Sequence, residues 1–513
     1  MSVRRILVIA GSDSSGGAGL EADQKVIAAH GGYAMTATTA LTAQNTKGVV
    51  DIHHVPPEFL KKQIDACLED IGVDVVKTGM LASTETIKVV ADALKRHKVC
   101  RTVVDPVMVS TSGAQLLPKD SVKPLLSDVL PLTTVLTPNI PEAQLLLEEA
   151  GFPFRKPERK DDLVAIAKGL QKLGPKYVLL KGGHLPLTKD GDVSAAAADH
   201  HTVFNVLVSS DQEYIIENNY QRSKNTHGTG CSLASAIAAN LANGLDVPAA
   251  VQAASRYVEA GIKYSQSIGH GSGPINHFHS TYSLPFSADH FVDYILERSD
   301  VRIPWSDYTE HEFVRQMAEG TLPVERFKYY LIQDYLFLIQ FSRANALAAY
   351  KANNMRDINR SAEIVRHIQA ETSLHISYCE QEFGISKEQI ISTEEDQACT
   401  AYTRFVLDIG HQQDFFALQI ALLPCLLGYG VIARRLYDDP KTKKEGNLYW
   451  KWIKNYVADD YVEAVQLGRK LVEKEARKIS LHRLEELVDI FIKGTKLEKG
   501  FWDMGMQHET ALR

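Results

Sequence analysis

The chain has 513 residues, of which 45% are hydrophobic and 23% are charged, and its net charge is −7. Because a single hydrophobic core stops growing at about 250–300 residues, we expect two domains. The mild negative charge gives no basis for binding nucleic acid or an anionic membrane surface. The six cysteines form no Cys-x-x-Cys pair and no cluster with zinc-ligand spacing. The first apolar run, residues 6–10, is too short for the core of a signal peptide, so we expect a cytoplasmic protein with reduced thiols.

Up to about residue 268, strand-like apolar runs alternate with amphipathic helical patterns. This alternation is typical of βαβ units, so we predict a doubly wound α/β domain over residues 1–268. In such domains ligands bind beyond the carboxyl ends of the parallel strands. The expected strands are 5–10, 73–77, 102–105, 134–137 and 177–181, with 203–208 and 213–217 as antiparallel edge strands; the expected helices are 58–68, 84–96, 141–150 and 162–173.

A linker and a helical domain follow. Residues 269–287 are rich in Gly, Ser, His and Pro, which is typical of a linker. Over residues 288–513 apolar residues recur with a helical period, which predicts an all-α bundle. One stretch, 415–433, has no charged residue over about the length that spans a bilayer. It contains Pro, Gln and Gly and has amphipathic neighbours, so we predict a buried core helix.

Two glycine-rich turns of the first domain are candidates for binding an anion. The run AGSDSSGGAG, residues 10–19, follows the first strand and matches neither the dinucleotide-binding nor the Walker A pattern. The run Gly228-Thr229-Gly230-Cys231 opens a helix, where free backbone N–H groups can hold a phosphoryl group. The same field would bias Cys231 toward thiolate, so that it could take the proton of an attacking hydroxyl. An ordinary helix start is the alternative.

Polar residues at other strand ends are candidates for the same site. Asn139 and Glu142 could offer oxygen ligands to Mg²⁺, or they could form a capping box at a helix start. Asp105 ends a strand and adds a carboxylate to this region. Lys181 ends a further strand and could offer a cation to phosphate, or it could be a surface lysine before a turn.

In this order, the runs AGSDSSGGAG, DPVM, TPNIPEA, LLKGGH and GTGC resemble the hydroxymethylpyrimidine (phosphate) kinases of thiamin biosynthesis, which belong to the ribokinase superfamily. The resemblance covers residues 3–268. It implies a ribokinase-like fold and two ATP-dependent phosphorylations, first of the alcohol 4-amino-5-hydroxymethyl-2-methylpyrimidine and then of its monophosphate. Most superfamily members carry Asp where this chain has Cys231, whereas a cysteine there is similar to this family and to close pyridoxal-kinase relatives.

The resemblance also implies roles for individual residues. Asn139, Glu142 and Asp105 would organise Mg²⁺ and ATP. Lys181 would face the nucleotide phosphates, and Cys231 would be the catalytic base. A carboxylate and an amide suit the donors and acceptors of an aminopyrimidine edge, and a methionine supplies apolar contact. The resemblance places Gly11, Asp23, Gln44, Met80 and Val107 around the pyrimidine, and Gly228, Thr229 and Gly230 at the phosphate.

The helical domain has its own candidates. Cys425 and Tyr429 are four residues apart and share one helix face. Pro424 removes a backbone hydrogen bond beside the thiol, so we expect a local bend. Asp334 lies in a nearly continuous apolar run, where a carboxylate is costly unless it is paired. Taken singly, the cysteine could be a core residue, the aspartate could make a structural hydrogen bond, and Glu498 could lie on the surface.

The runs FKYYLIQDYLFL, AYT, ALLPC, WIKNY and ExxFW resemble the TenA/thiaminase-II family over about residues 288–510. That family implies a haem-oxygenase-like helical bundle. In it Cys425 would be a nucleophile that adds to the pyrimidine ring, Asp334 would hold the ring nitrogen and amino group, and Glu498 would be the acid/base. Many members have a second aromatic hydroxyl three residues after the aspartate, where this chain has Phe337. The site would be lined and polarised by Tyr402, Tyr429 and Tyr456, with Phe501 as a wall.

Together the two halves resemble the bifunctional thiamin-biosynthesis proteins of fungi. The TenA-like half would hydrolyse aminomethyl-pyrimidine or thiamin, and both reactions yield the alcohol that the first half would phosphorylate. The resemblance thus implies ATP as a substrate, Mg²⁺ as a cofactor, small pyrimidines and thiamin as ligands, and a homo-oligomer, either a dimer or a tetramer. The alternative is a pyridoxal-type kinase fused to a non-catalytic helical module for oligomerisation or binding.

Overall fold

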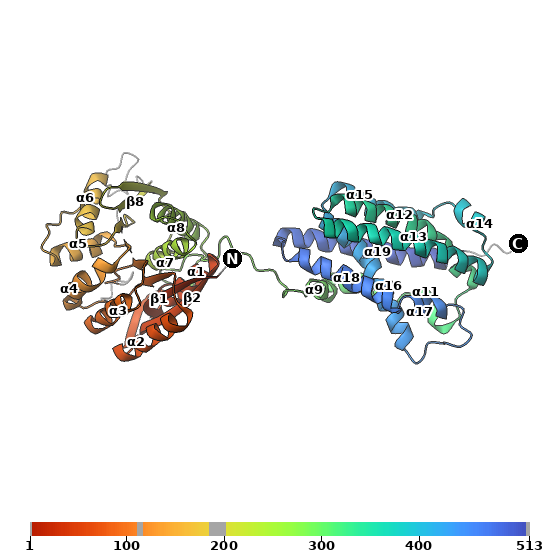
Figure 1. Cartoon of the computed structure of the whole chain (residues 1–513), viewed down its shortest axis with the longest axis horizontal. Helices are drawn as coiled ribbons and strands as arrows, with labels where there is room; N and C mark the ends of the chain where they lie inside the picture. Colours follow the sequence, from red (N-terminus) through yellow and green to blue (C-terminus); the bar gives the residue numbers. More distant parts are fainter. Residues whose placement is uncertain (1–2, 110–115, 184–201, 509–513) are drawn as a thin grey trace. The chain divides into compact units, whose positions relative to one another are not determined.

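The structure, a computed structural model, describes residues 3–109, 116–183 and 202–508. By its backbone contacts the chain divides into two compact units, Met1–Thr281 and Tyr282–Arg513 (Figure 1). The first unit contains a sheet covered by helices, and the second is helical in all its described elements. His184, the last residue of the LLKGGH run, lies outside the described residues.

The first unit is built on a nine-stranded sheet in the order β3-β2-β1-β4-β5-β6-β7-β8-β9. Strands β2, β1, β4, β5, β6 and β7 are parallel, while β3, β8 and β9 each pair antiparallel with their neighbours. The chain runs outward from β1 in both directions, which is the doubly wound arrangement predicted from the alternating pattern. The strands are β1 (Arg4–Asp13), β2 (Gly32–Asn45), β3 (Gly48–His54), β4 (Val75–Thr78), β5 (Thr102–Val104), β6 (Val135–Leu136), β7 (Tyr177–Leu180), β8 (Thr202–Val208) and β9 (Glu213–Asn219).

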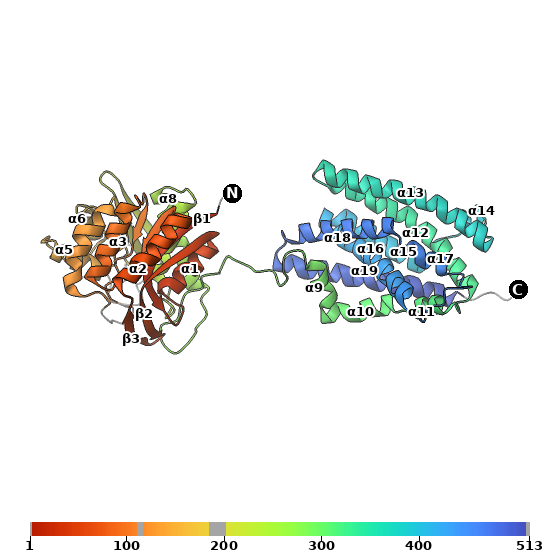
Figure 2. The ribbon, with the colours of Figure 1, turned by 60° about the horizontal axis from the view of Figure 1, so that its bottom comes forward.

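Two hydrophobic cores lie on opposite faces of this sheet. Along β1, Leu7 and Ile9 enter one core, while Ile6, Val8 and Ala10 enter the other, because successive side chains of a strand point to opposite faces. The first core includes residues of α2 (Pro57–Ala66), α3 (Thr84–Arg96), the short α4 (Val122–Pro124), α5 (Ile140–Glu149) and α6 (Lys160–Gln171). The second includes residues of α1 (Gly19–Ala29), α7 (Thr229–Ala242) and α8 (Val247–Lys263). Figures 1 and 2 show these helices around the sheet.

The segment expected as a linker, residues 269–287, lies within the first unit as far as Thr281. Its backbone is bonded to that unit, since Ser272 N donates to the Thr46 carbonyl at 2.9 Å and Asn276 N donates to the Gly261 carbonyl at 2.9 Å. The glycines allow this close approach, because a Cβ at Gly271 would collide with the Thr46 carbonyl. Composition indicated an irregular segment correctly, but not that it packs against a domain.

The second unit packs its long helices around one hydrophobic core. Its central element, α16 (Phe415–Asp438), contacts α15 (Gln397–Gln412), α18 (Asp459–Ala476) and α19 (Leu481–Gln507). Figure 2 shows α16 among these helices. The remaining helices are α9 (Phe291–Glu297), α10 (Ser299–Thr309), α11 (Glu312–Glu319), α12 (Val324–Lys351), α13 (Met355–Phe383), α14 (Lys387–Ser392) and α17 (Trp450–Asn455).

Helix α16 is the one described helix that is long and apolar enough to cross a membrane, and 67% of its most apolar window is buried inside the unit. It begins with the Asp414 side chain, which accepts from Ala417 N, and it carries Pro424 without ending there. Two helices lie very close to it at glycines. A Cβ at Gly428 would collide with the ring and hydroxyl of Tyr308 on α10, and a Cβ at Gly468 on α18 would collide with Leu426. The helix is therefore packed into the bundle, as predicted.

Gly428→Ala tests this packing. The new methyl group has no space beside Tyr308, so we expect the variant to lower the free energy of unfolding of the second unit by about 1–3 kcal/mol. Gly500→Ala in α19 is the matched control, because its Cβ would meet no atom within 4 Å and alanine favours a helix by about 1 kcal/mol. Thermal unfolding should show a lower midpoint for the first variant and a higher one for the second. Equal shifts of the same sign would contradict the packing described.

Candidate active sites

A cavity of about 560 Å³ opens in the first unit at the carboxyl ends of the parallel strands. Three of its lining residues come from strand ends: Asp105 directly follows β5, Lys181 directly follows β7, and Met80 lies two residues after β4. Twelve of the residues predicted for this site line the cavity: Gly11, Gln44, Met80, Asp105, Val107, Asn139, Glu142, Lys181, Gly228, Thr229, Gly230 and Cys231.

The N-terminus of α7 forms one end of the cavity. Gly228 precedes the helix with φ 79°, and a Cβ there would collide with the carbonyl oxygen of Gly17. The glycine-rich turn after β1 and the turn before α7 are thus in van der Waals contact. A Cβ at Gly230 would lie 3.2 Å from Lys181 Nζ. Backbone N–H groups of a helix start and a lysine cation therefore converge, which is the arrangement that binds phosphate.

Lys181 is held among carboxylates. Its Nζ lies 2.7 Å from Asp105 Oδ1 and 4.0 Å from Glu142 Oε2, and its side chain is only 13% exposed. Thr137 Oγ1 also donates to Asp105, at 3.2 Å. The surface position considered for this lysine is therefore wrong.

Asn139 and Glu142 form the capping box of α5. Asn139 Oδ1 accepts from Glu142 N at 2.9 Å, and Glu142 Oε2 accepts from Asn139 N at 2.8 Å. The same glutamate is also part of the charge cluster. Burial raises the pKa of Glu142 to about 7; Lys181 acts to lower it and Asp105 to raise it. A capping box and a role as Mg²⁺ ligands are therefore compatible for this pair, because the Glu142 carboxylate both caps the helix and lines the cavity.

The expected thiolate character of Cys231 is not found. Burial raises the pKa of its thiol to about 11; the Lys77 cation and the Gly19 backbone act to lower it, whereas Asp23 and Asp105 act to raise it. Removal from water and two carboxylates outweigh the helix field on which the sequence-based expectation rested. Cys231 is therefore a neutral thiol at pH 7 in this structure.

Asp23 does not line the cavity, contrary to the predicted contact with the pyrimidine. Its carboxylate is fully buried on α1, where Lys77 Nζ lies 2.7 Å from Oδ2 and Ser235 Oγ donates to Oδ1 at 2.7 Å. Burial acts to lower the pKa of Lys77, but the Asp23 charge holds it above its ordinary value. Asp23 thus holds in place the Lys77 cation, whose charge acts on Cys231.

Sequence reasoning missed Asp13 and His227. His227 Nε2 lies 2.8 Å from Asp13 Oδ2 and 3.4 Å from Gln44 Nε2, and all three residues line the cavity. The pair joins the glycine-rich turn after β1 to the turn before α7. Burial acts to raise the pKa of Asp13, but hydrogen bonds from His227 and Ser15 lower it to about 2. Asp13 stands inside the run AGSDSSGGAG and His227 directly precedes the run GTGC, so their positions were visible although their pairing was not.

In the second unit, Cys425 meets Glu498. The carboxylate of Glu498 on α19 is 1% exposed and accepts from Tyr402 Oη at 2.7 Å. Burial raises the pKa of Glu498 to about 8; hydrogen bonds from Tyr402 and Cys425 act to lower it, Asp334 acts to raise it, and the Tyr308 hydroxyl acts to lower it. A surface position for Glu498 is therefore wrong, and an acid that is protonated near neutral pH lies beside a thiol.

Asp334 is another buried acid of this unit. Burial raises the pKa of its carboxyl to about 7. Its Oδ2 lies 3.9 Å from Nδ1 of His375, which stands on the neighbouring α13. His375 Nε2 is 2.8 Å from the Leu331 carbonyl and so carries the proton that it donates there. Two acids with raised pKa values in one interior are typical of a catalytic site.

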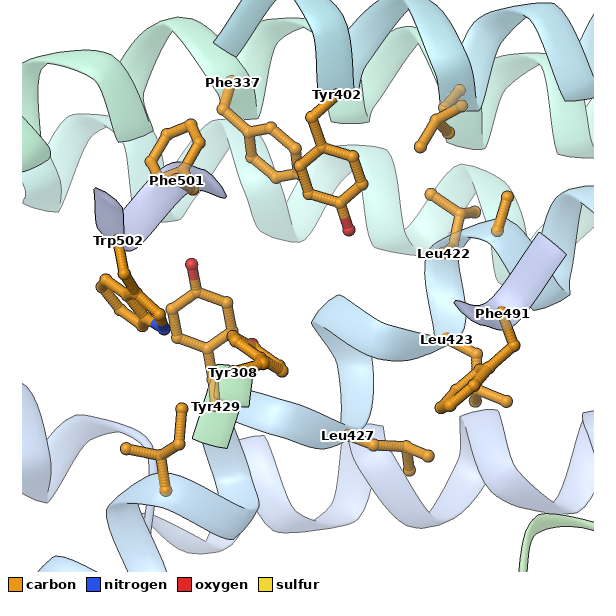
Figure 3. Packing of buried hydrophobic residues seen from close by; sticks show 14 of the residues in the cluster. Tyr308, Phe337, Tyr402, Leu422, Leu423, Leu427, Tyr429, Phe491, Phe501 and Trp502 are labelled. Carbon is orange, nitrogen blue, oxygen red and sulfur yellow. The ribbon is translucent and has the colours of Figure 1, made fainter. Parts of the chain in front are cut away.

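Aromatic rings surround these acids. Phe337 stacks on Tyr402 with ring centroids 5.1 Å apart, and Phe501 meets Phe337 edge-on at 5.8 Å. Tyr429 and Tyr456 lie 5.1 Å apart. Figure 3 shows Phe337 beside Tyr402, whose hydroxyl points away from it into the bundle. The predicted residues are thus brought together by α12, α15, α16 and α19, with Tyr456 at the end of α17.

Four more polar groups of this interior escaped the sequence analysis. The hydroxyls of Tyr308 and Tyr330 and the indole N–H groups of Trp452 and Trp502 are buried without a hydrogen-bond partner of normal geometry among the described residues. Aromatic residues at helical spacing are mostly core residues, so the sequence carried no signal for them. Buried donors that lack a hydrogen bond of normal geometry are available to a polar ligand.

Each unit matches a known protein family. The phosphomethylpyrimidine kinase family matches residues 13–276, and the TENA/THI-4/PQQC family matches residues 298–508. A solved structure of a phosphomethylpyrimidine kinase from Clostridium difficile is 39% identical and covers 50% of this chain and 97% of its own, with a TM-score of 0.42.

Similarity to curated relatives extends over both units. A Schizosaccharomyces pombe relative with a hydroxymethylpyrimidine/phosphomethylpyrimidine kinase name is 43% identical over 498 residues, which cover 97% of this chain and 90% of the relative. The hydroxymethylpyrimidine/phosphomethylpyrimidine kinase THI20 of Saccharomyces cerevisiae is 33% identical over 539 residues, which cover 98% of this chain and 96% of the relative. The chain therefore belongs to the phosphomethylpyrimidine kinase family and carries a second domain of the TENA/THI-4/PQQC family.

Proposed function

We propose that the chain is a bifunctional enzyme of thiamin pyrimidine salvage and synthesis. The first unit is a hydroxymethylpyrimidine/phosphomethylpyrimidine kinase, and ATP is its phosphoryl donor. The second unit hydrolyses aminomethyl-pyrimidine or thiamin and releases the alcohol that the first unit phosphorylates. The observation that supports hydrolysis by the second unit is the contact of Cys425 with the buried acid Glu498. A thiol can act as the nucleophile, and a protonated carboxyl beside it can act as the general acid.

In the kinase reaction, Gln44, Gly11, Met80 and Val107 hold the pyrimidine. The phosphoryl oxygens lie against the N–H groups of residues 228–230 and the Lys181 cation, which stabilise the charge that develops on them. The hydroxyl of the substrate attacks the terminal phosphorus, and its proton passes to the sulfur of Cys231. Because phosphoryl transfer is loose and depends mainly on positioning, a thiolate present as a minor species suffices.

The carboxylates near Lys181 fit a divalent cation. Asp105 and Glu142 are buried with Lys181 as their nearest countercharge, and burial, with a smaller contribution from Asp105, raises the pKa of Glu142. We propose that these carboxylates, with Asn139, hold Mg²⁺. When bound, Mg²⁺ neutralises phosphate charge and aligns the phosphates of ATP.

In the second reaction, Asp334 binds the amino group and ring nitrogen of the pyrimidine, and Tyr402, Tyr429, Tyr456 and Phe501 enclose the ring. Cys425 adds its sulfur across a carbon–nitrogen double bond of the ring, and the thiol proton passes to the ring nitrogen that Asp334 holds. The addition weakens the bond between the methylene carbon and its leaving group, and the later elimination returns this proton to the sulfur. Glu498, whose pKa is raised to about 8, protonates the departing amine and then takes a proton from the water that replaces it. Elimination of the thiol restores Cys425 and gives the alcohol.

Reciprocal cysteine variants test the two assignments. With aminomethyl-pyrimidine, ATP and Mg²⁺, the wild-type protein should form the pyrimidine diphosphate. Cys425→Ser should lower release of the alcohol at least about a hundredfold and leave phosphorylation of added alcohol intact, because only the nucleophile of the second unit is weakened. Cys231→Ser should do the reverse. Product analysis by chromatography decides, and survival of both steps in Cys425→Ser would remove the second-site assignment.

The pH dependence of phosphorylation tests the role of Cys231. If its thiolate takes the proton, turnover should rise by up to about tenfold per pH unit above pH 7 and level off near pH 11, where the thiol loses its proton. Cys231→Asp places a carboxylate that is already ionised at pH 7, so its profile should be flat over the same range. A flat wild-type profile would contradict proton transfer to the thiol.

Glu142→Gln tests the cation site. Glutamine has the same length and can still accept from Asn139 N, so the cap of α5 is kept while one negative charge is lost. We expect the Mg²⁺ concentration for half-maximal kinase activity to rise about tenfold, with alcohol release by the second unit unchanged. Activity measured against Mg²⁺ concentration checks this, and an unchanged requirement would place the cation elsewhere.

A further inference from the structure

Tyr308 is a buried phenol with no assigned role. It lies on α10, is 0% exposed, and its hydroxyl has no hydrogen-bond partner of normal geometry among the described residues. A buried hydroxyl without a partner costs about 1–3 kcal/mol, so a phenylalanine would serve packing better. The presence of the hydroxyl therefore indicates a use other than stability.

The backbone of α16 leaves room for this side chain. Gly428 is the residue whose missing Cβ admits the ring and hydroxyl of Tyr308. Gly428 follows Cys425 by three residues on the same helix, so both lie on one face. Trp502 stacks on the ring at a centroid distance of 6.4 Å and limits its rotation. The hydroxyl is thus held rigidly beside the face that carries the thiol.

The charges that act on Tyr308 identify what it faces. Burial raises its pKa well above the ordinary value, and Glu498, Cys425, Tyr402 and Tyr461 each raise it further, in that order. In return, the hydroxyl acts to lower the pKa of Glu498. In Figure 3, Tyr308 and Tyr402 enter the interior from different helices. Glu498 therefore has two phenols near it, of which Tyr402 is bonded to it at 2.7 Å.

We propose that Tyr308 is a positioning residue of the second site, whose hydroxyl holds the Glu498 carboxyl toward Cys425 when that carboxyl is ionised. This rests on the proposed hydrolytic function and adds to it a second phenol that sets the proton affinity of the acid/base. Tyr402 keeps its bond to Glu498 in both protonation states, whereas Tyr308 completes its own bond only as the proton leaves. The unpaired hydroxyl of the resting structure is the state from which that change begins.

Tyr308→Phe tests the proposal. The ring still fills the space beside Gly428, and one unpaired hydroxyl is lost, so the melting temperature should not fall. We expect kcat for alcohol release to fall about tenfold with KM nearly unchanged, because the interaction acts on a proton transfer and not on substrate binding. The limb of the pH profile that Glu498 controls should move to higher pH, since a group that lowers its pKa is gone. Asp334, Tyr429, Tyr330 and Cys425 also face Glu498, and the variant leaves them in place.

Tyr449→Phe is the matched control. Tyr449 is another buried tyrosine of this unit, but its hydroxyl donates to the Leu322 carbonyl and burial alone raises its pKa. Loss of that bond should lower the melting temperature and leave kcat and the pH profile unchanged. A Tyr308→Phe protein that has wild-type kcat and profile, or that loses activity only together with melting temperature as a structural residue would, overturns the proposal.

A second measurement does not depend on hydrolysis. Iodoacetamide alkylation of Cys425, followed by mass spectrometry of its peptide against pH, reports the ionisation of the neighbouring Glu498 in the full-length protein. Its inflection should lie at higher pH in Tyr308→Phe than in the wild type and in Tyr449→Phe. If the wild type releases no alcohol, the proposed hydrolysis fails while this shift still supports Tyr308 as the positioning group. An unmoved inflection refutes Tyr308 whatever the activity.

Discussion

A carboxylate removed from water needs a partner, and both sites are organised by that requirement. In the first unit Asp105 is ion-paired with Lys181, and Glu142 shares the remaining charge of that lysine. In the second unit Glu498 is bonded by Tyr402 and Cys425. The acids remain poised because their partners are too few to neutralise them. Burial is the largest cause of the raised pKa values of Glu142 and Glu498, and these partners offset it only in part.

The two folds meet the requirement by different routes. In the first unit the acids and the lysine come from the ends of parallel strands, which meet at one edge of the sheet, and the anion is met by the start of α7. In the second unit the polar groups project inward from long helices, where they stand at helical spacing among aromatic rings. A sheet edge gives an open cavity at the carboxyl ends of the strands. A bundle interior buries its polar groups among aromatic rings.

The architecture of both units could be predicted because each half of the sequence has one dominant pattern of apolar residues. The parallel strands appear as apolar runs between amphipathic helices, and β8 and β9 were also expected. Strands β2 and β3 were not, because β2 is rich in Ala and Thr and has little apolar contrast. The charge-free stretch around Pro424 was correctly predicted as a core helix, since its glycines and its neighbours indicate close packing.

Site residues could be predicted from the sequence where they belong to a recognisable motif. They could not be predicted where the role of a side chain depends on a partner that is distant in the sequence. Asp23 is a carboxylate near the glycine-rich turn, which led to its prediction as a site residue. In the structure it is ion-paired with Lys77, fifty-four positions later, and does not line the cavity. Cys231 stands at a helix start, but burial raises the pKa of its thiol, and the carboxylates that raise it further come from α1 and from the residue after β5. Tyr308 has no local signal at all. Such long-range pairings depend on tertiary structure.

The contact between Gly428 and Tyr308 ties two distant positions together. The ring of one occupies the volume that the other leaves empty, so a larger residue on α16 requires a smaller one on α10. Neither position can drift alone without loss of packing. Across related chains the two should therefore change in step, and a chain with alanine in place of the glycine would have to give up the phenol as well.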